Sequence, residues 1–279
     1  IARAKGEIVE ALAPEGWAVL NADDPRVDAM AARTRAHLAR WSLDTRRPLD
    51  AELAVRSVDI HADKLQRHRF TLEVTRAGHA EHHPVSLQLV GAHQVANATA
   101  TATMALALGL DADLVAHQLS QAMARSRWRM EVHDLPNGAR IINDSYNANP
   151  DSMAAAVGAL AAMGATRRAE NPQARTIAIL GDMAELGAAA ADLHRQLGAS
   201  LGANGIDELY AVGGYAPDLA EGAHAAGVRT HTVDREQIAA LLDLHAGDVV
   251  LIKASRVVGL DRVATTLIGT PTPGREGNA

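Results

Sequence analysis

Cysteine is absent from this chain of 279 residues, which excludes both disulfide bonds and thiolate chemistry. Aromatic residues make up only 3% of the sequence, so the 48% hydrophobic share, rich in alanine, predicts a mainly aliphatic core. No apolar run approaches the roughly 18 residues of a membrane span, and no transmembrane helix is predicted. The sequence begins with "IARAKGEIVEAL", without Met, and we interpret the chain as a piece of a longer protein.

Basic charge is also in short supply, because the formal net charge is −6. A surface that tracks a phosphate backbone needs an excess of basic residues, so we expect no nucleic-acid partner. The 22% share of charged residues is typical of a globular protein, and the length is sufficient for two domains.

The first half of the sequence changes pattern near residue 52. Before it, helical and extended patterns alternate, which favours part of a parallel α/β sheet. After it, alternating apolar and polar residues with a turn at Ala77-Gly78 predict three antiparallel strands within 52–90. The expected elements are a helix over 1–12, strands in 17–21 and 40–44, a helix over 27–40, and helices over 93–110 and 111–123, the last N-capped by Asp111.

The second half has a regular alternation of strands and alanine-rich helices, which predicts a Rossmann-like parallel sheet. A hairpin signal at 136–138 precedes it. The expected strands are 140–144, 176–180, 208–212, 229–233 and 248–253. We therefore predict an α/β chain with domains at 1–128 and 129–270 and a tail at 271–279.

Polar residues gather where three of these strands end. The segment "NDSYNANP" (143–150) follows the first strand, "GDMAELG" (181–187) the second and "KASR" (253–256) the last. Turn formation and helix capping, with Asp151 or Ser152 as N-cap, explain one or two such residues. Because ligands bind at the carboxyl ends of parallel strands, the whole set favours a ligand site.

These segments, together with "KGEI", "NADDP", "GAHQVANATA" and "RWRMEV" in the same order, resemble the Mur ligases of peptidoglycan synthesis. Within that family they are most similar to the members that add D-alanyl-D-alanine. The resemblance implies the latter part of a P-loop-type central ATPase domain carrying a small antiparallel sheet, followed by a Rossmann-like C-terminal ligase domain. The phosphate-binding GxxGK[ST] motif is missing, since none of the three lysines lies in one.

The resemblance also implies a reaction. A cytoplasmic, monomeric ligase would join D-alanyl-D-alanine to UDP-MurNAc-tripeptide through an acyl phosphate, with ATP and Mg²⁺ as cofactors. We expect the chain by itself to be inactive and to bind ATP weakly or not at all. Other amide ligases of the Mur or folylpolyglutamate type remain as alternatives, as does a non-catalytic nucleotide- or peptide-binding module.

The site residues follow from matching motifs to this family. Lys5 corresponds to a carbamylated lysine, whose carboxylate-like oxygens suit Mg²⁺. The residues alone favour an ordinary surface lysine, and only the resemblance reverses that interpretation. Arg129 and Asp144 are the other expected catalytic residues, and both would also face the nucleotide. The remaining nucleotide-binding candidates are Asn97, His93 and Asn21.

The acceptor side is expected to combine both signs of charge, because D-alanyl-D-alanine carries an ammonium and a carboxylate. For each residue a capping or salt-bridge role has about the same prior as a ligand contact. The expected substrate-binding residues are Tyr146, Asn147, Asn149, Asp182, Glu185, His194, Lys253, Ser255 and Arg256.

Overall fold

The structure, a computed structural model, describes residues 2–124 and 126–269. The chain divides into two compact units, unit 1 up to Met123 and unit 2 from Ala124. This division falls just before the boundary that we predicted between 128 and 129. The predicted tail at 271–279 lies outside the described residues.

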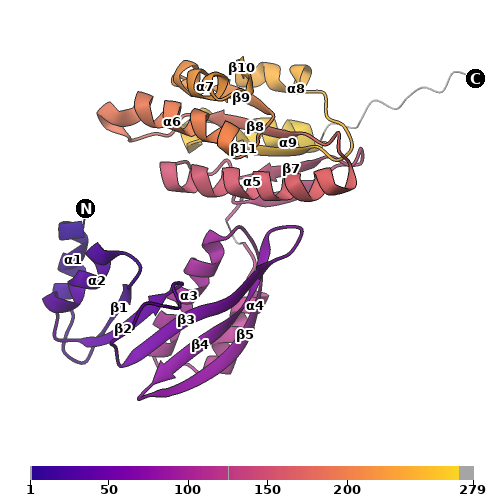
Figure 1. Ribbon diagram of the computed structural model, residues 1–279. Helices are drawn as coiled ribbons and strands as arrows, with labels where there is room; N and C mark the ends of the chain where they lie inside the picture. Colours follow the sequence, from indigo (N-terminus) through magenta and orange to yellow (C-terminus); the bar gives the residue numbers. More distant parts are fainter. Residues whose placement is uncertain (1, 125, 270–279) are drawn as a thin grey trace, which may run out of the picture. The chain divides into compact units, whose positions relative to one another are not determined.

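Unit 1 is built on a mixed sheet whose strands follow one another in chain order (Figure 1). The first three pair in parallel and the last three antiparallel, which confirms the three antiparallel strands predicted within 52–90. The strands are β1 (Trp17–Asn21), β2 (His37–Ser42), β3 (Leu53–Ala62), β4 (Arg67–Arg76) and β5 (His79–Val90).

Two helices pack on one face of this sheet, α3 (His93–Ala107) and α4 (Ala112–Gln121). The core between them is aliphatic apart from Phe70, as the composition predicts. Asp111 caps α4 as expected, because its side chain accepts a hydrogen bond from the Leu114 N–H at 2.9 Å. A smaller apolar cluster packs α1 (Ala2–Glu10), α2 (Pro25–Asp28) and the 3-10 helix η1 (Ala29–Arg33) against β1.

The prediction of one helix over 27–40 is wrong in its second half. Helical structure ends at Arg33, and β2 begins at His37. Strand β2 pairs in parallel with β1 on one side and β3 on the other, and Ala39 in it is fully buried. The backbone hydrogen bonds of a central strand outweigh the weak helical preference of this alanine-rich stretch.

Unit 2 contains a six-stranded sheet in the order β10-β9-β8-β11-β7-β6. All neighbours are parallel except β6 and β7, which form the predicted hairpin. The strands are β6 (Glu131–Asp134), β7 (Arg140–Asn143), β8 (Thr176–Gly181), β9 (Glu208–Val212), β10 (Arg229–Thr232) and β11 (Val249–Lys253). The parallel strands therefore agree closely with the prediction.

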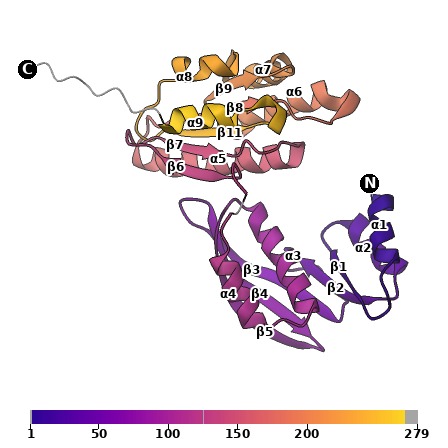
Figure 2. The ribbon, with the colours of Figure 1, turned by 180° about the vertical axis from the view of Figure 1, so that it is seen from behind.

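Helices cover both faces of this sheet. The first face carries α5 (Pro150–Glu170), α6 (Ala190–Ala203) and α7 (Ala216–Ala225), which pack on one another in that order (Figure 1). The second carries α8 (Ile238–Leu241) and α9 (Asp261–Gly269), with α9 in front in Figure 2. Short 3-10 turns complete the unit: η2 (Gly187–Ala189), η3 (Arg235–Gln237) and η4 (Arg256–Val258).

The strand order places a topological switch at β11. Strands β7 and β8 lead into helices on one face, whereas β11, which lies between them, leads into α9 on the other. The loops therefore diverge at the carboxyl end of β11, and such a point forms a crevice suited to a ligand.

The start of α5 corrects one detail of the sequence interpretation. Asn149, and not Asp151 or Ser152, is the N-cap residue. Its Oδ1 accepts from the Ser152 N–H at 2.8 Å, while the Ser152 Oγ accepts from the Asn149 N–H at 3.1 Å. Pro150 follows in the first helical turn, where its missing N–H is harmless. Among the described residues, no helix is both long enough and apolar enough to span a membrane.

Candidate functional site

A buried ion pair lies where β7 and β11 end. Lys253, only 2% exposed, places its Nζ 2.6 Å from the Asp144 Oδ2. The same ammonium group donates a hydrogen bond of 2.8 Å to the Asn147 carbonyl. Lys253 therefore holds the loop after β7 in place and compensates the charge of Asp144.

Asp144 also fixes the segment that enters unit 2. Its Oδ1 accepts from the Met130 N–H at 3.1 Å, and the Tyr146 N–H donates to the Trp128 carbonyl at 3.1 Å. Trp128 and Met130 both have left-handed backbones, with φ of 61° and 49°. Non-glycine residues seldom adopt this conformation, so these hydrogen bonds stabilise a strained segment on either side of Arg129.

Aromatic rings contact arginine side chains in this region, with Arg129 and Arg256 at shorter distances than Arg127. The Arg129 guanidinium carbon lies 4.3 Å from the Tyr146 ring centroid, and that of Arg256 lies 4.0 Å from the Trp128 ring centroid. A ring face attracts a cation and leaves the edge of the guanidinium group able to donate hydrogen bonds. The sequence interpretation did not assign Trp128, although it lies in the quoted segment "RWRMEV".

The loop after β8 is attached to the start of α7. The two carboxylate oxygens of Asp182 accept from the Gly214 and Tyr215 N–H groups, each at 2.9 Å. Gly213 makes this approach possible, because its φ is 108° and an added Cβ would lie 2.6 Å from the Asp182 carboxylate. Asp182 thus joins the carboxyl ends of β8 and β9.

His194 lies beneath the same loop and is fully buried. Its Nε2 accepts from the Met183 N–H at 2.9 Å, so the ring proton is on Nδ1, which donates to the Ala190 carbonyl at 2.6 Å. The ring stacks on Tyr215 with centroids 4.6 Å apart. Both ring nitrogens are therefore engaged, and His194 positions the loop around Met183.

Ser255 connects three loops at the switch point. Its N–H donates to the Asp182 carbonyl at 2.9 Å, and its Oγ accepts from the Ala184 N–H at 2.8 Å. The same hydroxyl donates a longer bond of 3.4 Å to the Ala148 carbonyl. Ser255 is only 2% exposed, so its hydrogen bonds connect the loops after β7, β8 and β11 in the interior of the unit.

Several predicted residues of unit 2 remain open to solvent. Tyr146 is 41% exposed, and Asn147, Arg129 and Glu185 are exposed as well. Glu185 has a left-handed backbone with φ of 65°, and Asn147 uses its Oδ1 to accept from the Ala148 N–H. Arg256 is half-exposed and forms an ion pair of 3.0 Å with Asp261. The surface that these exposed residues form thus carries both positive and negative charge.

A hollow of about 310 Å³ adjoins Asp182 on this edge of the sheet. Its walls come from the carboxyl ends of β8 and β9, from η3 and from η4, and include Gly213, Arg235, Glu236 and Val257. The sequence interpretation missed Arg235, Glu236 and Tyr215, although the rule that located Asp182 also applies to the ends of β9 and β10.

The predicted residues of unit 1 come from three separate elements. Lys5 is exposed on α1 and has no hydrogen-bond or ion-pair partner in the described part of the chain. Asn21 ends β1, where its Oδ1 accepts from the Asp23 N–H at 2.9 Å. Asn97 lies exposed on α3, and its Nδ2 donates to the Gln94 Oε1 at 3.1 Å. His93 begins the same helix with its ring against Gly91.

These residues fit the implied cofactors only in part. An exposed lysine without a partner is available for carbamylation, and the Asn97 amide can still offer a carbonyl to an adenine edge. However, the described residues contain no group of three or more His, Asp or Glu residues that could hold a metal ion. Within the described residues, Lys5 is therefore the one candidate for a Mg²⁺ ligand that the resemblance implies.

Comparisons with known proteins agree with this architecture. A family described as the Mur ligase middle domain matches residues 1–105, and one described as the Mur ligase glutamate ligase domain matches residues 128–256. The chain therefore belongs to the Mur ligase family, of which it carries the middle and C-terminal domains.

Individual relatives give the same result. The chain is 38% identical over 98% of its length to the UDP-N-acetylmuramoyl-tripeptide–D-alanyl-D-alanine ligase of Mycobacterium tuberculosis, and 31% identical over 96% to that of Escherichia coli. It covers 55% of each relative, so it spans about half their length.

Solved structures show the same fold. MurF from Acinetobacter baumannii superimposes with a TM-score of 0.75 at 24% identity. MurF from Thermotoga maritima, solved in complex with ADP, superimposes with a TM-score of 0.71 at 23% identity. These matches cover 96% and 94% of the chain, and 55% of each solved chain.

Proposed function

We propose that this chain forms the middle and C-terminal parts of a cytoplasmic, ATP-dependent ligase that joins D-alanyl-D-alanine to UDP-MurNAc-tripeptide. The observation that carries the proposal is the 38% identity, over 98% of the chain, to proteins named for this reaction. The geometry of unit 2 supports it, because a site that joins two anionic reactants needs cationic and dipolar groups in fixed positions.

In the proposed reaction the tripeptide carboxylate attacks the γ-phosphate of ATP and gives an acyl phosphate and ADP. The amine of the dipeptide then attacks the acyl carbon, loses a proton and displaces phosphate. Mg²⁺, when bound, would neutralise phosphate charge, and carbamylated Lys5 would be one of its ligands. Asn97 and His93 are proposed to contact the nucleotide base. Asn21, at the end of β1, is proposed as a further nucleotide contact.

The nucleotide-facing role of unit 2 is assigned to Arg129 and Asp144. Arg129 lies on the Tyr146 ring, and its N–H donors have no partner among the residues that the structure describes, which suits contacts to phosphate oxygens. Asp144 has carboxylate lone pairs left for ribose hydroxyls after its bonds to Lys253 and Met130. Lys253 holds this carboxylate in position.

The acceptor role is assigned to the exposed groups of the same edge. We propose that Glu185 attracts the dipeptide ammonium and Arg256 its carboxylate, with Tyr146 and Asn147 beside them. Four other candidates act through the loops that they hold: Asn149, Asp182, His194 and Ser255.

The test uses protein at the full length of its curated relatives. Phosphate release should require UDP-MurNAc-tripeptide, ATP and D-alanyl-D-alanine, and free glutamate should not replace the dipeptide. Release with glutamate alone would instead indicate another ligase of this family. Calorimetry of the 279-residue chain with ATP should show no binding in the micromolar range.

The residue roles can be separated kinetically. Glu185→Gln should raise the KM for D-alanyl-D-alanine, whereas Arg129→Gln should lower kcat with little change in that KM. Asp113→Asn, at an exposed carboxylate in unit 1, provides the control for charge loss. Equal effects of the two test variants on both constants would contradict the assignment.

A further inference from the structure

We propose that unit 1 contains a second anion site, which binds a phosphate group in a cavity where β3, β4 and β5 meet. The cavity has a volume of about 390 Å³, and its polar lining includes His61, Asp63, Arg67, His68, Arg69 and Gln88. None of the residues that the family resemblance assigns lies in this lining. The proposal is independent of the ligase reaction.

The lining has an excess of positive charge on a chain that is negative overall. Asp63 is engaged by its own turn, since its Oδ2 lies 2.7 Å from both the Nε and the Nη2 of Arg67. Its Oδ1 accepts from the Leu65 and Arg67 N–H groups. Arg69, by contrast, is exposed and has no hydrogen-bond or ion-pair partner among the residues that the structure describes. One guanidinium group is therefore left without a counter-charge.

A buried nitrogen in the same lining also lacks a partner. His68 is 7% exposed, and its Nδ1 is buried without a hydrogen bond. Buried polar atoms are nearly always satisfied, so an orphan of this kind indicates a missing partner. His68 belongs to the lining, so this wall of the cavity contains a polar ring that the described residues leave partly unsatisfied.

The backbone is irregular at the same place. The β3–β4 ladder is interrupted between Val58 and His61, and the β4–β5 ladder between Arg67 and Arg69. Asp59 and Gln66 have left-handed backbones, with φ of 54° and 59°. Bulges redirect side chains and recur beside binding sites, and here two of them coincide with the cavity.

The arrangement favours phosphate over a simple carboxylate. A carboxylate is planar and is satisfied by one arginine fork, whereas a phosphate group accepts hydrogen bonds in several directions. The available donors come from two adjacent strands, His61 on β3 and Arg69 on β4, which are paired across the ladder and therefore lie on the same face of the sheet. Both line the cavity, so donors reach it from two separate side chains rather than from a single fork.

The experiment is an NMR titration of the 279-residue chain with inorganic phosphate, at ionic strength held constant with sodium chloride. Saturable shifts should appear at the amides of Arg67, His68, Arg69 and Gln88. Sodium acetate under the same conditions should bind more weakly. Arg69→Gln should weaken phosphate binding by about tenfold, because it removes a charge-assisted hydrogen bond.

The matched control is Arg35→Gln, which removes the same charge from unit 1. Arg35 is exposed and precedes β2, which pairs with the first residues of β3. His61 lies near the other end of β3, so Arg35 is away from the cavity. This variant should bind phosphate as the unaltered chain does. Equal weakening by both variants, shifts spread over the whole chain, or equal affinity for acetate and phosphate would overturn the proposal.

Discussion

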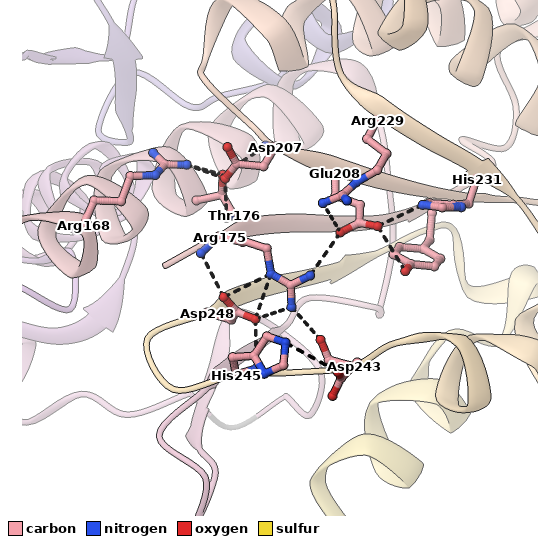
Figure 3. A network of polar contacts seen from close by, with 11 residues as sticks. Arg168, Arg175, Thr176, Asp207, Glu208, Arg229, His231, Asp243, His245 and Asp248 are labelled. Atoms are coloured by element: carbon pink, nitrogen blue, oxygen red, sulfur yellow. Dashed lines mark hydrogen bonds and ion pairs between the residues drawn. The ribbon is translucent and has the colours of Figure 1, made fainter. Parts of the chain in front are cut away.

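The two ends of the unit 2 sheet are both rich in charged residues, but they use those charges differently. At the amino end the charges form a closed network (Figure 3). Arg175 lies 2.6 Å from the buried Asp248, and Glu208 accepts from Arg229 at 3.1 Å and from His231 at 2.8 Å. Each of these carboxylates is compensated by a neighbouring cation, so these groups serve the fold.

At the carboxyl end, the buried charges are paired, whereas other polar side chains remain exposed. Lys253 and Asp144 form a buried pair, whereas Glu185, Arg129 and Tyr146 remain exposed above it. Both ends contain buried ion pairs, so the presence of such pairs does not identify the site. The two ends differ because the carboxyl end carries the βα loops of the switch point. Among the described residues, it also keeps exposed polar groups that have no partner.

The largest effect is expected from Lys253→Met. This change leaves the Asp144 carboxylate buried without its cation and frees the Asn147 carbonyl. Breaking a buried pair in this way costs roughly 3–5 kcal/mol of the free energy of unfolding. Denaturant unfolding of the chain measures it, with Arg262→Met, an exposed cation of the same unit, as the control. A loss below about 1 kcal/mol would show that this pair does not hold the carboxyl end together.

A smaller loss is expected at the amino end from Asp248→Asn. Asp248 is 1% exposed and accepts hydrogen bonds from Arg175 and from the His245 N–H. Asparagine keeps the shape but removes the charge, which should lower the free energy of unfolding by about 2–3 kcal/mol. In the full-length ligase, kcat/KM should stay unchanged, because Asp248 lies at the end of the sheet opposite to the proposed site. Asp243→Asn, at a residue whose side chain is 86% exposed, is the control.

Alkaline pH should weaken the amino-end network through one phenol. Burial, followed by the negative charge of Glu208, raises the pKa of Tyr210 to about 12. The folded state holds this proton more tightly than the unfolded state, whose phenol titrates near 10. The contribution is therefore complete below pH 10 and is lost as pH rises toward 12, by up to about 2–3 kcal/mol.

Tyr210→Phe isolates this contribution. At neutral pH the variant should be less stable by about 1 kcal/mol, because the hydroxyl no longer donates to the Glu208 Oε1. Denaturation at a series of pH values should show this deficit shrinking, and then reversing, between pH 10 and 12. A deficit that stays constant across that window would mean that Tyr210 does not titrate differently in the two states.

The smallest effect is expected from Trp128→Leu at the carboxyl end. The change removes the cation–π contact between the Trp128 ring and the Arg256 guanidinium group, which is worth about 0.5–1 kcal/mol at an exposed site. In the full-length ligase this corresponds to a two- to fivefold loss, roughly, in kcat/KM. Trp128→Phe keeps a ring and should recover most of the activity. A loss of folding stability without loss of activity would contradict a role for this contact in the reaction.

The parallel strands of unit 2 could be predicted because each is a short, buried aliphatic run bounded by polar loops. Such runs are recognisable without knowledge of their partners, and so are the polar residues at their ends. Strand β2 was recognised only in part, because the strand predicted at 40–44 overlaps it at 40–42. Its first residues continue the helical pattern of 27–40, and pairing with strands on both sides makes them extended.

The candidate site divides in the same manner. The motifs identified Asp144, Lys253 and Ser255 as candidates. They did not show that Lys253 and Ser255 are buried and hold loops together. The contacts of Lys253 and Ser255 join segments more than 70 residues apart, so local patterns do not reveal them. The cap at Asn149 is local instead, and the Pro150 that follows it is a sequence signal for this helix start.

The sequence by itself determined the family, the order of most helices and strands, and the kinds of side chain at the strand ends. These properties are local, because they follow from periodicity, turn chemistry and short motifs. Only the tertiary structure decided which polar groups are consumed by the fold and which stay free. That division depends on long-range pairing and burial, since a charged group is available to a ligand only where no neighbour already satisfies it.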